Sequence, residues 1–235
     1  MRAILLAAGK GTRISRIIEN IPKSTLPVEG IPLIRRNVIM LLEKNIKPIV
    51  CVGYFKDKIY EALEGLDVEY YYNPFYNKTN SIASLWFARE ALIEDTIIMN
   101  ADVYFDEQIL DGIIENKDVC SLMTDTSRKI VGDFFFNLEN GYIKKYGKEL
   151  PLEERSCEYV GIGKIRTCFI KEFKEKLEYL IDTQQHDLWW ENVLYSFVES
   201  YNINTHDING LFWAEIDYFD DYERILDYID KKDIC

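Results

Sequence analysis

The sequence predicts a single α/β domain over residues 1–235, built on a mostly parallel, mixed sheet with helices on both faces. Short apolar runs alternate with segments whose apolar residues recur at helical spacing, which is typical of a parallel sheet crossed by helices. The chain has no low-complexity linker and no internal repeat that would divide it. In such a sheet ligands bind at the carboxyl ends of the strands, where we expect the functional residues.

The first hundred residues alternate most clearly. Arg2 to Ala8 is a short apolar run that stops at a glycine cluster, as a buried strand does. Pro32 suits the start of the following helix, and Asn73-Pro74 breaks the chain after a later strand. Strands are predicted at 2–8, 49–53, 68–73 and 96–99, and helices at 33–45, 56–66 and 81–92.

The pattern changes after Asp106, where strands follow one another more closely. Asn140-Gly141 lies between two strand-like runs and predicts a hairpin. Residues 203–208 and 211–216 are predicted to form a strand pair. The other predicted elements are a helix after Asp106, strands at 119–124, 131–137, 142–146 and 159–165, and helices at 169–181, 188–200 and 218–229.

Composition narrows the class of protein. The chain is 48% apolar, carries a formal charge of −12, and has no apolar run long enough to cross a membrane or to act as a secretory signal. An acidic chain lacks the clustered cations that a general nucleic-acid surface needs. The five cysteines are widely spaced, without a Cys-x-x-Cys pair, so they predict no zinc or disulfide framework. We therefore expect a cytoplasmic protein with no membrane or nucleic-acid partner.

The strongest local signal follows the first strand. Gly9 and Gly11 would let backbone N–H groups approach a phosphate chain, and Lys10, Arg13 and Lys23 supply local positive charge. The alternative is an ordinary glycine turn with solvated lysines. The segment is neither a dinucleotide fingerprint nor a Walker A loop, because the further glycines that those motifs require are absent.

A series of motifs extends this signal along nearly the whole chain. The opening, Gly9-x-Gly11-Thr12-Arg13 with Pro22-Lys23, resembles the nucleotidyltransferases that make NDP-sugars and CDP-alcohols. The segments that follow are similar in order and spacing to the bacterial CTP:phosphocholine cytidylyltransferase branch of that family. They are Leu26-Pro27-Val28, Ile31-Pro32-Leu33-Ile34, Asn73-Pro74, Thr79-Asn80-Ser81, Ser84-Leu85-Trp86, Asn100-Ala101-Asp102, Asp187-Leu188-Trp189-Trp190-Glu191-Asn192 and Glu215-Ile216-Asp217.

The resemblance implies a Rossmann-like nucleotide-diphospho-sugar transferase fold and a Mg²⁺-dependent reaction. CTP and a small phosphorylated alcohol, of the glycerol phosphate or phosphocholine type, would give a CDP-alcohol and pyrophosphate. Residues 1–105 would bind the nucleotide and residues 106–235 the acceptor. A sugar-1-phosphate nucleotidyltransferase and a non-catalytic nucleotide-binding protein are the alternatives, and the oligomeric state is left open.

The resemblance also assigns roles to residues. Arg13 would bind the β and γ phosphates, and Lys23 the α-phosphate or the acceptor phosphate. Asp102 and Asp217 would hold the metal, although a loop acid and a helix N-cap are the alternatives for these two. Asn100 stands where relatives often carry an acid, so ligation would depend more on this pair. The nucleotide would be bordered by Leu6, Ala8, Gly9, Lys10, Gly11, Thr12, Asn80 and Ser84.

The acceptor pocket is expected among acidic and aromatic residues, which suit a quaternary ammonium through cation–π attraction. Arg128 and Lys129, however, stand where phosphocholine enzymes have an aromatic contact, and two cations there would favour a neutral polyol phosphate. Trp189 by itself is expected to be buried. The residues assigned to acceptor binding are Lys23, Asp187, Trp190, Trp213 and Glu215, within a set that also includes Trp189 and Glu191.

Overall fold

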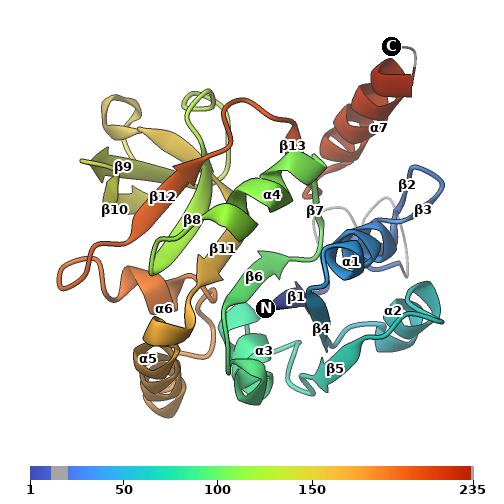
Figure 1. The fold of residues 1–235 in the computed structure, drawn as a ribbon, viewed down its shortest axis with the longest axis horizontal. Helices are drawn as coiled ribbons and strands as arrows, with labels where there is room; N and C mark the ends of the chain where they lie inside the picture. Colours follow the sequence, from blue (N-terminus) through green and yellow to red (C-terminus); the bar gives the residue numbers. More distant parts are fainter. Residues whose placement is uncertain (12–20, 234–235) are drawn as a thin grey trace.

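The computed structural model of the chain describes residues 1–11 and 21–233, and Thr12 and Arg13 lie outside them. A nine-stranded mixed sheet runs through the molecule in the order β5-β4-β1-β6-β11-β8-β12-β10-β9 (Figure 1). Its strands are β1 (Arg2–Ala7), β4 (Lys47–Val52), β5 (Glu69–Tyr72), β6 (Thr96–Asn100), β8 (Cys120–Asp125), β9 (Phe135–Glu139), β10 (Tyr142–Gly147), β11 (Cys157–Ile165) and β12 (Asn204–Asp207).

Smaller elements complete the fold. Two short antiparallel pairs lie outside the main sheet: β2 (Pro27–Val28) with β3 (Ile31–Pro32), and β7 (Val103–Phe105) with β13 (Trp213–Glu215). The helices are α1 (Leu33–Glu43), α2 (Lys56–Ala62), α3 (Ser81–Phe87), α4 (Glu107–Glu115), α5 (Ile170–Asp182), α6 (Asn192–Tyr195) and α7 (Phe219–Asp233). The 3₁₀ turns are Lys23–Thr25, Arg89–Ala91, Leu152–Glu154 and Thr167–Phe169.

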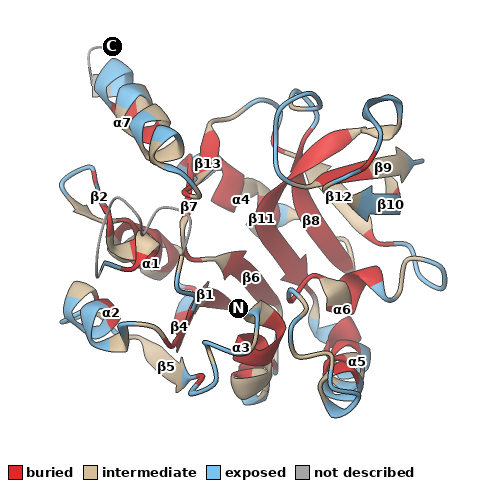
Figure 2. Ribbon diagram, turned by 180° about the vertical axis from the view of Figure 1, so that it is seen from behind, coloured by how far each residue is buried: buried red, intermediate tan, exposed pale blue. Residues whose placement is uncertain are grey.

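The predicted fold class is confirmed. Strands β5, β4, β1 and β6 pair in parallel, and the sheet becomes mixed at β11, which runs antiparallel to β6 and β8. Alternate residues of β1 point to opposite faces of the sheet. Both faces therefore carry apolar side chains, and helices cover both. Ile4 packs with the face covered by α3 and α5, whereas Ala3 and Leu5 pack with the face covered by α1 and α4 (Figure 2).

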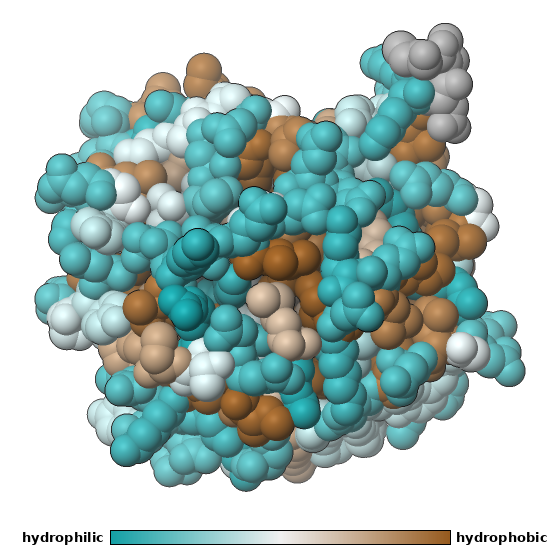
Figure 3. All heavy atoms as spheres, in the orientation of Figure 1, coloured by the Kyte–Doolittle hydropathy of each residue, from teal (hydrophilic) through white to brown (hydrophobic). Residues whose placement is uncertain are grey.

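The face of the molecule drawn in Figure 3 is largely hydrophilic, with separate apolar patches. Within residues 1–11 and 21–233, no helix is both long and apolar enough to cross a membrane.

The predicted pairing of 203–208 with 211–216 is wrong. β12 lies between β8 and β10 in the sheet, so both of its edges are already occupied. The chain turns at Asn209 and Gly210, which both have positive φ, and leaves the sheet. The following segment, β13, then pairs antiparallel with β7, a strand that the periodicity did not predict.

The predicted helix at 188–200 is also largely wrong, because α-helix is confined to α6. The backbone N–H of Trp190 donates to Ser81 Oγ at 2.9 Å, and that of Trp189 donates to Asn192 Oδ1 at 3.0 Å. These bonds hold residues 188–191 in turns against the start of α3. The turn brings Trp189 and Glu191 to the cavity described below.

Helix α7 packs on the body of the protein through Asp106, a buried carboxylate. Its oxygens accept hydrogen bonds from Tyr228 Oη at 2.7 Å and Lys232 Nζ at 3.1 Å, both on α7. Phe212 stacks on Tyr228 with ring centroids 3.8 Å apart. Because α7 begins two residues after Asp217, these contacts also help to fix the end of β13.

Asp106→Ala should lower the free energy of unfolding by about 1–3 kcal/mol, because it removes the charged acceptor of the hydrogen bonds from Tyr228 and Lys232. Asp111→Ala is the matched control on α4. Its carboxylate is half-exposed and pairs with Lys44, so its loss should cost about 0–1 kcal/mol. Urea denaturation monitored by circular dichroism measures both, and equal losses would contradict the role given to Asp106.

Candidate functional site

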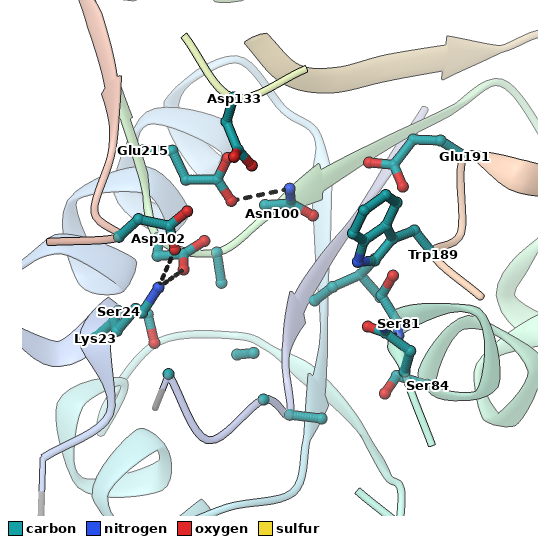
Figure 4. Close-up of a pocket in the computed structure, with 18 of the residues that line it drawn as sticks. Lys23, Ser24, Ser81, Ser84, Asn100, Asp102, Asp133, Trp189, Glu191 and Glu215 are labelled. Atoms are coloured by element: carbon teal, nitrogen blue, oxygen red, sulfur yellow. Dashed lines mark hydrogen bonds and ion pairs between the residues drawn. The ribbon is translucent and has the colours of Figure 1, made fainter. Parts of the chain in front are cut away.

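A cavity of about 350 Å³ opens at the carboxyl ends of β1 and β6 (Figure 4). Its walls come from the glycine loop after β1, the 3₁₀ turn at Lys23–Thr25, the start of α3, the end of β6 and the segment after β13. The wall opposite these segments comes from residues within 133–195. The predicted residues among those that line the cavity are Leu6, Ala8, Gly9, Gly11, Lys23, Asn80, Ser84, Asp102, Glu215 and Asp217.

The glycine loop is fixed by its contact with Lys23. Gly11 has φ +57°, and a Cβ at this position would lie 2.6 Å from Lys23 Cγ. A glycine is therefore needed both for the backbone conformation and for the path of the lysine side chain. Lys10 is exposed, with Nζ 6.0 Å from the ring centroid of Tyr76, and does not line the cavity.

Lys23 lies between the two carboxylates that the sequence assigned to a metal. Its Nζ is 2.5 Å from Asp217 Oδ1 and 3.7 Å from Asp102 Oδ2 (Figure 4). Burial alone would lower the pKa of Lys23, but the charges of Asp102 and Asp217 outweigh it and raise that pKa. Lys23 is therefore a cation in the folded protein.

The pairing of β7 with β13 explains why these two acids meet. In this ladder Glu215 lies opposite Val103, and the backbone N–H of Ile216 donates to Asp102 O at 3.0 Å. Asp102 directly precedes β7 and Asp217 follows β13. The two residues are far apart in the sequence but are held at adjacent ends of one antiparallel pair.

A third acid adds to the negative charge. Glu215 Oε1 accepts a hydrogen bond from Asn100 Nδ2 at 3.3 Å, so residue 100 contributes an amide donor to this acid. Burial, together with the charges of Asp102 and Asp217, raises the pKa of Glu215 well above its usual value. The pKa of Asp102 is raised mainly by burial. Within residues 1–11 and 21–233, Lys23 is the basic side chain that pairs with Asp102 and Asp217.

Across the cavity from Lys23, the wall is a polar network around the start of α3. Asn80 accepts a hydrogen bond from the backbone N–H of Ser81 at 2.8 Å. Ser84 Oγ accepts one at 3.0 Å from Asn73 Nδ2, whose residue is also buried. Asn80 and Ser84 thus face the cavity from positions fixed by local hydrogen bonds.

The far end of the cavity is aromatic and acidic. Phe134 stacks on Tyr195 with a centroid distance of 5.7 Å and meets the edge of Trp189 at the same distance. Glu191 also lines this end, and burial raises its pKa to about 7. No ion pair joins Glu191 to a basic side chain within the described part of the chain. Asp133, Lys148 and Tyr159 complete this end.

Three residues that the sequence assigned to the acceptor lie elsewhere. Trp190 is fully buried and does not line the cavity, and a Cβ on Gly163 would lie 2.8 Å from its ring. Trp213 is buried with Nε1 donating to Asp125 Oδ2 at 2.9 Å, and Asp187 is exposed outside the cavity. The expectation for Trp189 is reversed, because this side chain is 39% exposed and lines the cavity.

The cations expected near the acceptor are also elsewhere. Arg128 Nε pairs with the buried carboxylate of Glu158 at 2.8 Å, and its guanidinium lies 4.9 Å from the ring of Trp213. Neither Arg128 nor Lys129 lines the cavity. The basic residue there is Lys148, which the sequence did not single out and which pairs with Asp133 at 2.5 Å.

Asp102 and Asp217 are the residues that could hold a divalent cation. Asp102 and Asp217 present oxygen ligands of the kind that Mg²⁺ prefers, and both carboxylates already converge on a single positive charge. Among the described residues no cluster of three His, Cys, Asp or Glu side chains is arranged as a ready-made metal site. Mg²⁺ commonly uses one or two carboxylates together with substrate phosphates, so a two-carboxylate set fits it.

The sequence of the chain matches the MobA-like NTP transferase domain over residues 3–157. The CTP:phosphoglutamine cytidylyltransferase of Campylobacter jejuni is 28% identical, covering 95% of this chain and 98% of its own. The choline-phosphate cytidylyltransferase of Haemophilus influenzae is 27% identical, covering 96% of both chains.

Solved structures share the fold. The CTP:phosphocholine cytidylyltransferase of Streptococcus pneumoniae superimposes with a TM-score of 0.78, at 21% identity, over 97% of this chain and 98% of its own. The inositol-1-phosphate CTP transferase of T. maritima gives a TM-score of 0.76 at 20% identity, over 97% and 95% of the two chains. The chain belongs to the MobA-like NTP transferase family, and it is a nucleotidyltransferase, as the sequence predicted.

Glu191→Gln should flatten the pH dependence of stability. Because burial raises the folded pKa of Glu191 from 4.5 to about 7, the folded protein keeps a proton that the unfolded chain releases. The contribution is therefore present below about pH 4.5 and is lost as the pH rises to about 7, by up to about 3 kcal/mol. Urea denaturation at pH 5.5 and 8.0 measures it, and identical pH dependence in both proteins would contradict this pKa.

Proposed function

We propose that this protein is a Mg²⁺-dependent cytidylyltransferase that joins CTP to a small phosphorylated alcohol, giving a CDP-alcohol and pyrophosphate. The observation that carries the proposal is the convergence of Asp102, Asp217 and Lys23 beside the glycine loop, in a cavity with a separate aromatic and acidic end. One end suits a triphosphate and the other suits a small acceptor. The same proposal includes that the protein acts in the cytoplasm as a single domain, with no nucleic-acid or membrane partner.

The chemistry needs charge compensation more than covalent catalysis. An oxygen of the acceptor phosphate forms a bond to the α-phosphorus of CTP while the bond from that phosphorus to the β-phosphate oxygen breaks, and pyrophosphate leaves. Both reactants are anions, so their repulsion is the main obstacle. The acceptor oxygen is already ionised, so the reaction requires no general base.

Each group at the site has a role in this reaction. Asp102 and Asp217 would hold Mg²⁺, which neutralises phosphate charge and aligns the reacting groups when bound. Lys23 would turn to the α-phosphate or the acceptor phosphate, where its compact charge follows the transfer. The glycine loop would approach the phosphates, with Arg13 expected on the β and γ phosphates. Asn80 and Ser84 would border the nucleoside.

Preference for CTP rests on the relatives, since the two cytidylyltransferases named above match nearly the whole chain. The alternative, a sugar-1-phosphate nucleotidyltransferase, has support from the fold alone. A putative glucose-1-phosphate thymidylyltransferase of Bacillus anthracis superimposes with a TM-score of 0.76 but is 17% identical.

Within the proposed acceptors, the cavity favours one with a cationic head group. Glu191 is buried at the far end, and Trp189, Phe134 and Tyr195 surround that end with aromatic rings. A buried carboxylate and aromatic faces together stabilise an ammonium group. The argument for a neutral polyol depended on Arg128 and Lys129, which lie outside the cavity. Lys148 does stand at this end, with Nζ 5.1 Å from the ring of Trp189, but Asp133 balances its charge.

Pyrophosphate release measured with Mg²⁺ tests the reaction. We expect it with CTP and a phosphorylated alcohol such as phosphocholine or phosphoethanolamine, but not with glucose-1-phosphate.

Asp102→Ala and Asp217→Ala should each reduce kcat at least a hundredfold, whereas the surface control Asp111→Ala should keep full activity. Release with a sugar phosphate alone would support the alternative, and near-normal activity in either site variant would remove that residue from the metal site.

Glu191→Gln should separate acceptor binding from nucleotide binding. Loss of the carboxylate should raise KM for a cationic acceptor about tenfold or more, because the ammonium loses its counter-charge. KM for CTP and the activity toward glycerol phosphate, if any, should stay within about twofold. Steady-state kinetics at pH 8.0 measure the difference, and an equal rise in both KM values would place Glu191 outside the acceptor pocket.

A further inference from the structure

The side chain of Lys23 is largely enclosed, although the proposed function requires it to contact a substrate. Its side chain is only 10% exposed, and its stem packs against Gly11 so closely that no side chain fits between them. Lysines are almost never fully buried unless they are paired. Here the pairing partners are Asp217 and Asp102, the two acids that would bind the metal.

An ammonium and a divalent cation compete for the same carboxylate oxygens. The two acids and the adjacent Glu215 crowd negative charge into a buried space, and Lys23 compensates part of it. While Nζ lies 2.5 Å from Asp217 Oδ1, a metal ion at that oxygen would face a positive charge at short range. This repulsion is strong at the low dielectric of a partly buried site.

The nucleotide changes this balance. A triphosphate brings several negative charges to the glycine loop, and these attract Lys23 away from the carboxylates while they supply the further oxygen ligands that Mg²⁺ requires. Two carboxylates by themselves give Mg²⁺ few protein ligands. The metal and the nucleotide are therefore expected to bind with positive coupling, and each must raise the affinity for the other by the same factor.

We propose that Lys23 is an internal counter-ion of the metal site: it holds Asp102 and Asp217 together and keeps a divalent cation out until the nucleotide arrives. This extends the proposed function, because it assumes that the carboxylates take a metal and that the glycine loop takes a triphosphate. Lys23 then has two successive partners, the carboxylates before the nucleotide binds and a phosphate afterwards. The metal enters only with the nucleotide.

Mn²⁺ binding to the nucleotide-free protein tests this directly. Titration followed by electron paramagnetic resonance of free Mn²⁺ measures affinity without any need for turnover. We expect weak binding to the wild type, and binding at least tenfold tighter to Lys23→Met and Lys23→Gln. Lys23→Arg keeps the charge and should stay weak. The double variant Lys23→Met/Asp217→Asn should lose the gain, since one of the two carboxylates is gone.

Lys148→Met is the charge-matched control. Lys148 lines the same cavity but pairs with Asp133, so its removal should leave Mn²⁺ affinity unchanged. Circular dichroism checks that each variant is folded, and Lys23→Gln provides a second neutral variant of similar length if Lys23→Met does not fold. Unchanged affinity in the folded neutral variants, or an equal gain in Lys148→Met, would overturn the proposal.

A second readout tests the role of the nucleotide. Water-proton relaxation should report protein-bound Mn²⁺ in the wild type only when CTP is added, and in Lys23→Met also without CTP. Equal enhancement of the wild type with and without CTP would contradict the counter-ion role. The outcome is independent of the reaction: tighter Mn²⁺ binding in Lys23→Met, with no pyrophosphate released by the wild type, would overturn the proposed function and leave this inference standing.

Discussion

The site depends on one short piece of backbone pairing, the antiparallel contact between β7 and β13. It lies outside the main sheet, yet it sets the distance between Asp102 and Asp217, which are separated by more than a hundred residues. The buried carboxylate of Asp106 ties α7 to the same region. The large sheet provides a stable platform, and this small pair places the acidic groups over it.

The electrostatics follow from that placement. Bringing Asp102, Asp217 and Glu215 together in a buried space costs free energy, because each charge is desolvated and repels the others. Lys23 and the amide of Asn100 reduce this cost, and in the proposed reaction a metal ion would reduce it further. In the proposed reaction, a metal ion held by Asp102 and Asp217 would supply the positive charge that a chain with a formal charge of −12 needs in order to bind an anionic substrate.

Local pattern predicted the four parallel strands β1, β4, β5 and β6 and the helices between them, since each is recognisable from its own residues. It failed where partners were decided by distant segments. Residues 211–216 paired with β7 because both edges of β12 were occupied, which no local pattern shows. Trp189 lines the cavity and Trp190 is buried, the reverse of the expectation, because the backbone N–H of Trp190 donates to Ser81 and fixes the turn. Phe134, Tyr195 and Lys148 reach the cavity from separate segments, so their sequence carried no shared signal.

The contact between Gly11 and Lys23 limits the substitutions that the two positions tolerate, in evolution and in engineering. Because a Cβ at residue 11 would meet the lysine stem, the two positions form one unit, and neither can be exchanged freely while the other is kept. In diverging relatives we expect the pair to be inherited together or replaced together. A loop redesigned to accept another nucleotide would have to retain this glycine, even though it carries no side chain that recognises a base.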